Sequence, residues 1–173
     1  LNLKDLHIIY SQKFNLIIIT NNISSFSRGE SRNVIEIKSD FNKFTFLPLI
    51  CYEIIFSGNL TKNFNYDFIL NISEDGWFGK SIGQRQHFAH SIFRALENGK
   101  YIVRSANNGM AAIINPLGEG EKKINYQEAG FIDFEKRRDL DPTLFSIYGN
   151  KIFIILILLY ILLIFSFNKN INE

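Results

Sequence analysis

Short apolar segments and one amphipathic segment alternate through the middle of the chain. Residues 44–50 and 67–73 are dense runs of aromatic and aliphatic side chains, which are typical of buried strands. Residues 101–106 and 110–115 form a second pair of such runs. Between them, residues 107–109 (Asn-Asn-Gly) are a strong signal for a hairpin turn. The pattern therefore predicts two buried strands followed by a hairpin.

One helix is expected between these strands. Across residues 84–98 the apolar positions follow helical spacing, and Gly99 supplies a stop. Residues 76–79 predict a glycine-punctuated loop that carries the only tryptophan, and residues 130–135 predict a further strand. Strands with an intervening helix indicate an α/β or α+β layered domain, which we expect over residues 1–143.

The polar and weakly patterned segments predict one further strand and two loops. Residues 14–19 predict a strand, whereas residues 24–32 and 119–123 predict solvated loops. The chain does not begin with methionine, and charged residues interrupt any apolar run at its start. No secretory signal is therefore expected, and the sequence is expected to lack its true start.

The C-terminal region predicts a transmembrane helix. Residues 152–167 are sixteen positions without a charge, which rise roughly 24 Å as a helix against a hydrocarbon core of ~30 Å. A buried core helix is the alternative, but this segment is apolar on all sides and is followed by the polar tail 168–173. Residues 144–151 would then be the linker to this helix.

Composition and charge narrow the class of protein. The 173 residues suit one domain, and 46% hydrophobic with 21% charged residues is ordinary for a globular protein. A net charge of +2 gives no reason to expect a nucleic-acid partner. His87 and His90 lie three residues apart on the expected helix, but no third ligand is evident, so neither a metal nor a cofactor is expected.

The chemistry centres on Cys51, the only cysteine of the chain. A lone cysteine at the end of an apolar strand is commonly a small core residue. It can instead be a nucleophile, because a strand exit presents a side chain at the edge of a sheet. The nearby Glu53 would disfavour the thiolate, so a reactive Cys51 needs a cation or a base from elsewhere. The candidates in the chain are His87, His90, Lys80, Arg85 and Arg104.

Several further motifs follow one another in a fixed order. They are PLICYE at 48–53, NISEDGWFGKS at 71–81, QHF at 86–88, RALE at 94–97, RSANNG at 104–109, NPLG at 115–118 and TLFSIYG at 143–149. This series closely resembles the apolipoprotein N-acyltransferases, bacterial inner-membrane enzymes with a carbon–nitrogen hydrolase (nitrilase-type) domain. The resemblance covers roughly residues 24–167 and identifies the chain as a C-terminal fragment of such a protein.

The resemblance implies a fold and an activity. The fold is an α/β, nitrilase-type α-β-β-α sandwich, partial in this chain, which faces the periplasm and precedes the terminal membrane helix. In this family a cysteine takes an acyl chain from a phospholipid as a thioester. It then passes the acyl chain to the amine of a diacylglyceryl apolipoprotein. The implied partners are those two substrates and the membrane, and we expect a monomer.

The resemblance also assigns roles to individual residues. Cys51 matches the nucleophile, and the backbone N–H of Tyr52 would donate to the tetrahedral oxyanion. Glu53 matches a glutamate that organises the catalytic site. Trp77 and Phe78 match a mobile aromatic arm near the lipid entrance, although a plain core tryptophan is an alternative for this loop.

The chain also departs from the family. The general-base glutamate and the oxyanion-stabilising lysine of the family both lie upstream of the cysteine, at or before Leu1, and the surroundings of Lys4 do not match. We therefore expect the fragment alone to be inactive, because members of such a triad act as a unit. Two alternatives remain: an amidase acting on a small soluble amide, and a non-catalytic membrane-tethered remnant.

Overall fold

The computed structural model describes residues 32–38, 43–58, 60–135 and 139–171. The chain divides into two compact units, Leu1–Asn33 and Val34–Glu173, and every helix and strand described below belongs to the second. The strand predicted over 14–19 lies outside the described residues, as does the predicted loop 24–32 apart from its last residue.

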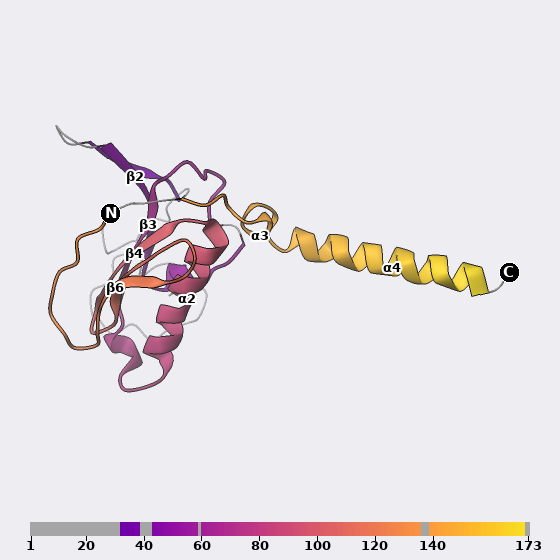
Figure 1. Ribbon diagram of the computed structural model, residues 1–173. Coiled ribbons are helices and arrows are strands. Elements are labelled where there is room, and N and C mark those ends of the chain that lie inside the picture. The colour runs from indigo at the N-terminus through magenta and orange to yellow at the C-terminus, as the bar shows by residue number, and fades with distance from the viewer. Residues whose placement is uncertain (1–31, 39–42, 59, 136–138, 172–173) are drawn as a thin grey trace, which may run out of the picture. The chain divides into compact units, whose positions relative to one another are not determined.

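A six-stranded mixed sheet forms the body of this second unit (Figure 1). Its strands follow one another in space in the order of the sequence, parallel in the pairs β2–β3 and β3–β4 and antiparallel elsewhere. They are β1 (Ile35–Lys38), β2 (Lys43–Ile50), β3 (Phe68–Glu74), β4 (Tyr101–Asn107), β5 (Ala111–Ile114) and β6 (Gly120–Ile124). The α/β class and the strands predicted over 44–50, 67–73, 101–106 and 110–115 are confirmed.

The two parallel pairs need crossover connections, because parallel strands cannot be joined by a tight turn. Between β3 and β4 the connection contains the short 3-10 helix η2 (Gly76–Phe78) and helix α2 (Gly83–Asn98). Helix α2 ends at Gly99, whose φ of 64° lies in the left-handed region that glycine tolerates. The predicted helix 84–98 is therefore confirmed together with its stop signal.

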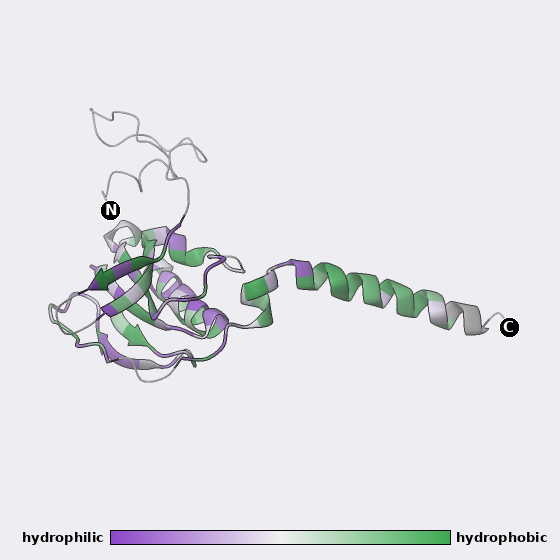
Figure 2. Cartoon of the chain, turned by 90° about the horizontal axis from the view of Figure 1, so that it is seen from above, coloured by the Kyte–Doolittle hydropathy of each residue, from purple (hydrophilic) through white to green (hydrophobic). Residues whose placement is uncertain are grey.

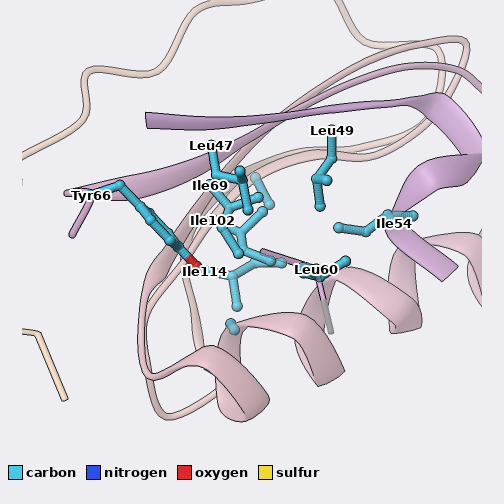
Figure 3. Close-up of a cluster of buried hydrophobic side chains, with 10 residues drawn as sticks. Leu47, Leu49, Ile54, Leu60, Tyr66, Ile69, Ile102 and Ile114 are labelled. Carbon is cyan, nitrogen blue, oxygen red and sulfur yellow. The ribbon is translucent and has the colours of Figure 1, made fainter. Parts of the chain in front are cut away.

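Helix α2 packs on one face of the sheet and closes the main hydrophobic core. Phe88, Ile92 and Ala95 follow helical spacing and contact the buried cluster that the strands contribute. In Figure 3 the side chains of Leu47, Ile69, Ile102 and Ile114 lie between the strands and this helix. The described residues thus supply one helix layer and one sheet of the implied four-layer sandwich.

The opposite face of the sheet is covered by an extended segment. Phe134 lies against the rings of Phe68 and Tyr101, with centroid distances of 5.0 and 5.4 Å. The strand predicted over 130–135 is wrong, since these residues have no regular structure. The alternating apolar pattern of this segment arises because Ile132 and Phe134 pack against the sheet, although the segment pairs with no strand.

The predicted solvated loop 119–123 is also wrong, because these residues lie almost entirely in β6. This strand forms an edge of the sheet and pairs with β5 through residues such as Lys122 and Lys123. Charged side chains are common on edge strands, where they discourage pairing with other chains. Strand β6 therefore carries little of the apolar pattern by which buried strands are recognised.

Two helices follow the sheet, α3 (Leu144–Tyr148) and α4 (Lys151–Ile171). The hydroxyl of Thr143 accepts from the Ser146 backbone N–H and caps α3, so the predicted linker 144–151 is partly helical. Helix α4 contains the apolar segment 152–167, and Figure 2 shows it hydrophobic along most of its length.

The prediction that residues 152–167 span a membrane is not supported. In the described part of the chain, no helix combines the length and the apolar character that a membrane crossing requires. The uncharged stretch rises roughly 24 Å, which is less than the ~30 Å of the hydrocarbon core.

Candidate active site

Cys51 lies where β2 ends and the 3-10 helix η1 (Cys51–Ile55) begins. Its φ is 49°, a left-handed conformation that side chains with a Cβ rarely adopt and that costs of order 1–3 kcal/mol. The thiol sulfur lies 3.6 Å from the Ser73 hydroxyl and 4.0 Å from the Glu74 carbonyl oxygen. The side chain is half-buried, so the surrounding structure holds a partly accessible thiol in a strained turn.

Three short polar side chains lie along β3 and directly after its end, close to this turn. Asn71, Ser73 and Asp75 occupy alternate positions, and all three are buried although the strand is otherwise mostly apolar. Buried polar groups are costly unless they are hydrogen-bonded. Their partners, described next, connect the turn of Cys51 to the neighbouring strand and to helix α2.

Asp75 is the centre of this cluster and is fully buried. Its carboxylate lies 2.7 Å from Arg104 Nη2 and 2.9 Å from His87 Nδ1, and it accepts a 2.6 Å hydrogen bond from Ser73. Burial alone would raise the pKa of Asp75. The hydrogen bonds from His87, Ser73 and Arg104, together with the Arg104 charge, outweigh burial and hold this pKa at about 2.

The lowered pKa of Asp75 predicts a loss of stability in acid. A carboxylate whose pKa is lower in the folded than in the unfolded chain stabilises the fold at any pH above the pKa of the unfolded state. For Asp75 this contribution disappears as the pH falls towards about 2. We expect Asp75 to contribute about 2 kcal/mol at pH 7, lost between roughly pH 5 and pH 2. Urea unfolding across this range should show a shallower pH dependence for Asp75→Asn. The matched change Asp133→Asn, at an exposed position, should leave the pH dependence of stability as in the unchanged protein. Equal pH dependence in both variants and the unchanged protein would contradict the role of Asp75 in acid stability.

The backbone carbonyl of Cys51 is held by the same cluster. His87 Nε2 lies 3.2 Å from this oxygen, and Asn71 Nδ2 donates to it at 3.4 Å. Asn71 also donates to the Leu49 carbonyl at 3.0 Å and accepts a hydrogen bond from Arg104 Nη1. The orientation of the turn therefore depends on side chains from β3, β4 and α2.

The structure brings part of the sequence-predicted site together around His87. The rings of Tyr52 and Phe78 lie against the imidazole, with centroid distances of 5.7 and 5.4 Å. Glu53 accepts a 2.8 Å hydrogen bond from the Ile50 backbone N–H, which braces the first turn of η1. Trp77 is 70% exposed, which excludes a plain core tryptophan at this position.

Of the candidate cations, only His87 and Arg104 belong to the cluster around Cys51. Lys80 and Arg85 line a pocket of about 360 Å³ together with Tyr126. Burial lowers the pKa of His90, and the charges of Arg94 and His87 lower it further.

No group of three His, Cys, Asp or Glu side chains gathers into a possible metal site within the described residues.

Sequence reasoning assigned no role to Asn71, Ser73 or Asp75. Their signal was present, since alternate short polar residues interrupt a strand that is otherwise apolar. Such residues on a buried face require hydrogen-bond partners. This pattern could have directed attention to the edge of the sheet next to Cys51.

Comparison with known proteins identifies the family of this chain. The model of the carbon–nitrogen hydrolase family matches residues 9–133. The chain belongs to this family. The expected resemblance to apolipoprotein N-acyltransferases is also confirmed. The chain is 50% identical over 119 residues to the "Apolipoprotein N-acyltransferase" of Rickettsia bellii, covering 68% of this chain and 24% of that protein.

Other relatives of this chain carry the same name. The protein of Wigglesworthia glossinidia brevipalpis is 45% identical over 109 residues, covering 62% of this chain and 22% of that protein. The chain thus spans about a quarter of the length of these relatives. Among solved structures, an amidase of the nitrilase superfamily from Nesterenkonia aligns with a TM-score of 0.45 at 14% identity, covering 60% of this chain and 41% of that one.

Proposed function

We propose that this chain is the C-terminal part of an apolipoprotein N-acyltransferase and that Cys51 is its nucleophile. The observation that carries the proposal is the strained turn of Cys51, which presents a half-buried thiol above a buried polar cluster. The names of the relatives support the class of reaction.

The thiol would attack the ester carbonyl of a phospholipid acyl donor. The new bond joins Sγ to the acyl carbon, and the thiol proton goes to a base. The ester C–O bond breaks, and the base returns that proton to the departing oxygen, so that the lysophospholipid leaves as an alcohol. The amine of a diacylglyceryl apolipoprotein would then attack this thioester, form an amide and release the thiol. Both substrates place the reaction at the bacterial inner membrane, on its periplasmic side.

Each sequence-predicted site residue has a proposed part in this reaction. The Tyr52 N–H would donate to the oxyanion, and Glu53 would keep the turn of Cys51 in place through its bond to Ile50 N–H. Trp77 and Phe78 would contact the acyl chain, which agrees with the exposed indole of Trp77.

We also propose that the chain alone transfers little or no acyl chain. Among the described residues, the thiol contacts a hydroxyl and a backbone carbonyl, neither of which is an effective base or a cation. The base glutamate and the lysine of the family are expected upstream of Cys51. Without such groups a thiol is mostly protonated at neutral pH and reacts slowly.

Intact mass spectrometry after incubation with phosphatidylethanolamine tests both proposals. We expect no acyl adduct on this chain. A chain extended upstream should form an adduct, which hydroxylamine should remove and which the Cys51→Ala variant of the extended chain should lack. An adduct on this chain alone would contradict its inactivity. An adduct on neither chain, with ammonia released from a small amide, would contradict the acyltransferase and support an amidase.

A further inference from the structure

A second buried polar cluster lies at the other end of the 3-10 helix η1. Arg94 and Glu97 from helix α2 are 5% and 8% exposed, and Arg94 Nη2 lies 2.7 Å from Glu97 Oε2. Nη1 of the same guanidinium donates to the carbonyl oxygens of Ile55, at 3.3 Å, and of Phe56. These are the last residue of η1 and the residue that follows it. Arg94 therefore holds the exit of the element that begins with Cys51.

Glu97 connects this guanidinium to the loop beyond η1. Its Oε2 forms the ion pair with Arg94, and its Oε1 accepts a hydrogen bond from the Gly58 backbone N–H. The carbonyl oxygen of Glu97 accepts a further hydrogen bond, at 2.9 Å, from the hydroxyl of Thr143. The carboxylate thus joins α2 to the loop after η1 and fixes the direction in which the guanidinium points.

The ion pair alone gives little reason for placing two charges inside the fold. Burial lowers the pKa of Arg94, and the charge of Glu97 opposes that shift. Buried ion pairs contribute little net stability, and well-packed apolar side chains of similar size commonly serve as well. Apolar side chains could not, however, donate to the carbonyls of Ile55 and Phe56. The property that is specific to this pair is therefore its hydrogen bonding at the exit of η1.

The strained turn of Cys51 needs restraint along the whole of η1. A residue with a φ of 49° keeps that conformation only while the surrounding structure prevents its relaxation. At the entrance, the polar cluster of the candidate active site holds the Cys51 carbonyl, and in the middle Ile54 lies in the hydrophobic core (Figure 3). At the exit, the backbone hydrogen bond that closes η1 is 3.4 Å long, so the charge-assisted bonds from Arg94 are the stronger restraint.

We propose that Arg94 is a positioning residue for Cys51, which it keeps in its strained conformation by holding the exit of η1, and that Glu97 orients Arg94 for this role. The inference rests on the proposed function for the reaction that Cys51 would perform. The restraint on the thiol itself can be measured without any substrate.

Alkylation follows this restraint, because Cys51 is the only cysteine. In Arg94→Lys the charge next to Glu97 is kept, but the planar fork that reaches two carbonyls is lost. We expect this variant to react with iodoacetamide about three- to tenfold faster at pH 7, since a loosened turn uncovers a thiol that is otherwise half-buried. The matched change Arg85→Lys, at an exposed position of the same helix, should alter the rate by less than about twofold. An unchanged rate in folded Arg94→Lys would contradict the proposal.

The dependence of alkylation on urea separates positioning from a general loss of stability. Reaction through global unfolding rises steeply with urea, whereas reaction through a local opening, which exposes little surface, depends on it weakly. We expect the added reactivity of Arg94→Lys to be nearly independent of urea below the unfolding transition. Phe134→Leu, which weakens packing on the other face of the sheet, should react without urea at the rate of the unchanged protein. A steep urea dependence in Arg94→Lys would overturn the positioning role.

A second variant keeps the test decisive if Arg94→Lys does not fold. Arg94→Met combined with Glu97→Leu removes both charges, so that no unpaired charge stays buried, and it also removes the donors to η1. We expect this double variant to fold, as far-UV circular dichroism would show, and to have the same faster alkylation. A folded double variant with the rate of the unchanged protein would contradict the proposal.

The chain extended upstream distinguishes failure of this inference from failure of the proposed function. With Arg94→Lys we expect acyl-adduct formation to slow about tenfold at saturating phosphatidylethanolamine, while the concentration for half-maximal rate stays the same, because Arg94 orients the nucleophile and not the lipid. If alkylation depends on Arg94 but no chain forms an adduct, the positioning role stands and the acyltransferase proposal fails. If the adduct forms equally fast with Arg94→Lys, the acyltransferase stands and the positioning role fails.

Discussion

Arg104→Met is expected to destabilise the domain by about 3–5 kcal/mol, because it leaves the carboxylate of Asp75 buried without its cation. Both side chains of this ion pair are completely inaccessible to solvent. An unpaired charge in such a place costs more than the ion pair itself contributes. Urea unfolding monitored by far-UV circular dichroism measures the loss.

Two controls make the Arg104 prediction specific. The change Arg85→Met removes an exposed arginine from helix α2 and should shift the free energy of unfolding by less than about 0.5 kcal/mol. Combining Arg104→Met with Asp75→Leu removes both charges and should recover part of the loss. Additive losses in the double variant would contradict direct coupling between the two residues.

Gly109→Ala is expected to destabilise the domain by about 3 kcal/mol, at the upper end of the range for overpacked positions. A Cβ at Gly109 would overlap Asp75 Oδ2 and lie 2.7 Å from both the Cβ and the Cγ of Asp75. Asp75 cannot move aside without losing its bonds to Ser73, His87 and Arg104. Thermal unfolding of the variant should therefore show a lower Tm.

A matched glycine tests whether the Gly109 effect comes from this contact. Gly120 lies in β6, and a Cβ added there would meet no atom within 4 Å. We expect Gly120→Ala to unfold close to the temperature of the unchanged protein. If both variants lose the same stability, the close approach of Gly109 to Asp75 is not the cause.

The central strands could be predicted because their own side chains carry the signal. Strands β2, β3 and β4 lie inside the sheet, and each contains a short apolar run, at residues 46–50, 68–70 and 101–103. Strand β6 could not be predicted in this way, because its place depends on hydrogen bonds to β5 and not on apolar side chains. Residues 130–135 show the reverse case, a strand-like pattern without a neighbouring strand.

The candidate site was predictable only in part. The end of an apolar run marked Cys51, but the role of Asp75 depends on partners 12 and 29 residues further along the chain, His87 and Arg104. A sequence pattern of period two shows that Asp75 is on a buried face, and does not show which residues meet it. The register between β3 and β4, which places Asn71 opposite Arg104, supplies that information.

The parallel centre of the sheet has a consequence for how the cluster forms during folding. Leu49 pairs with Asn71 and Asn71 with Arg104, so both parallel pairings must be in place before the turn of Cys51 has all of its partners. Contacts between residues so distant in sequence form slowly, since a long loop must close first. The amides of Asn71 and Arg104 should accordingly exchange with solvent deuterium only through global unfolding, and a partly folded chain would present Cys51 in a turn that nothing yet holds.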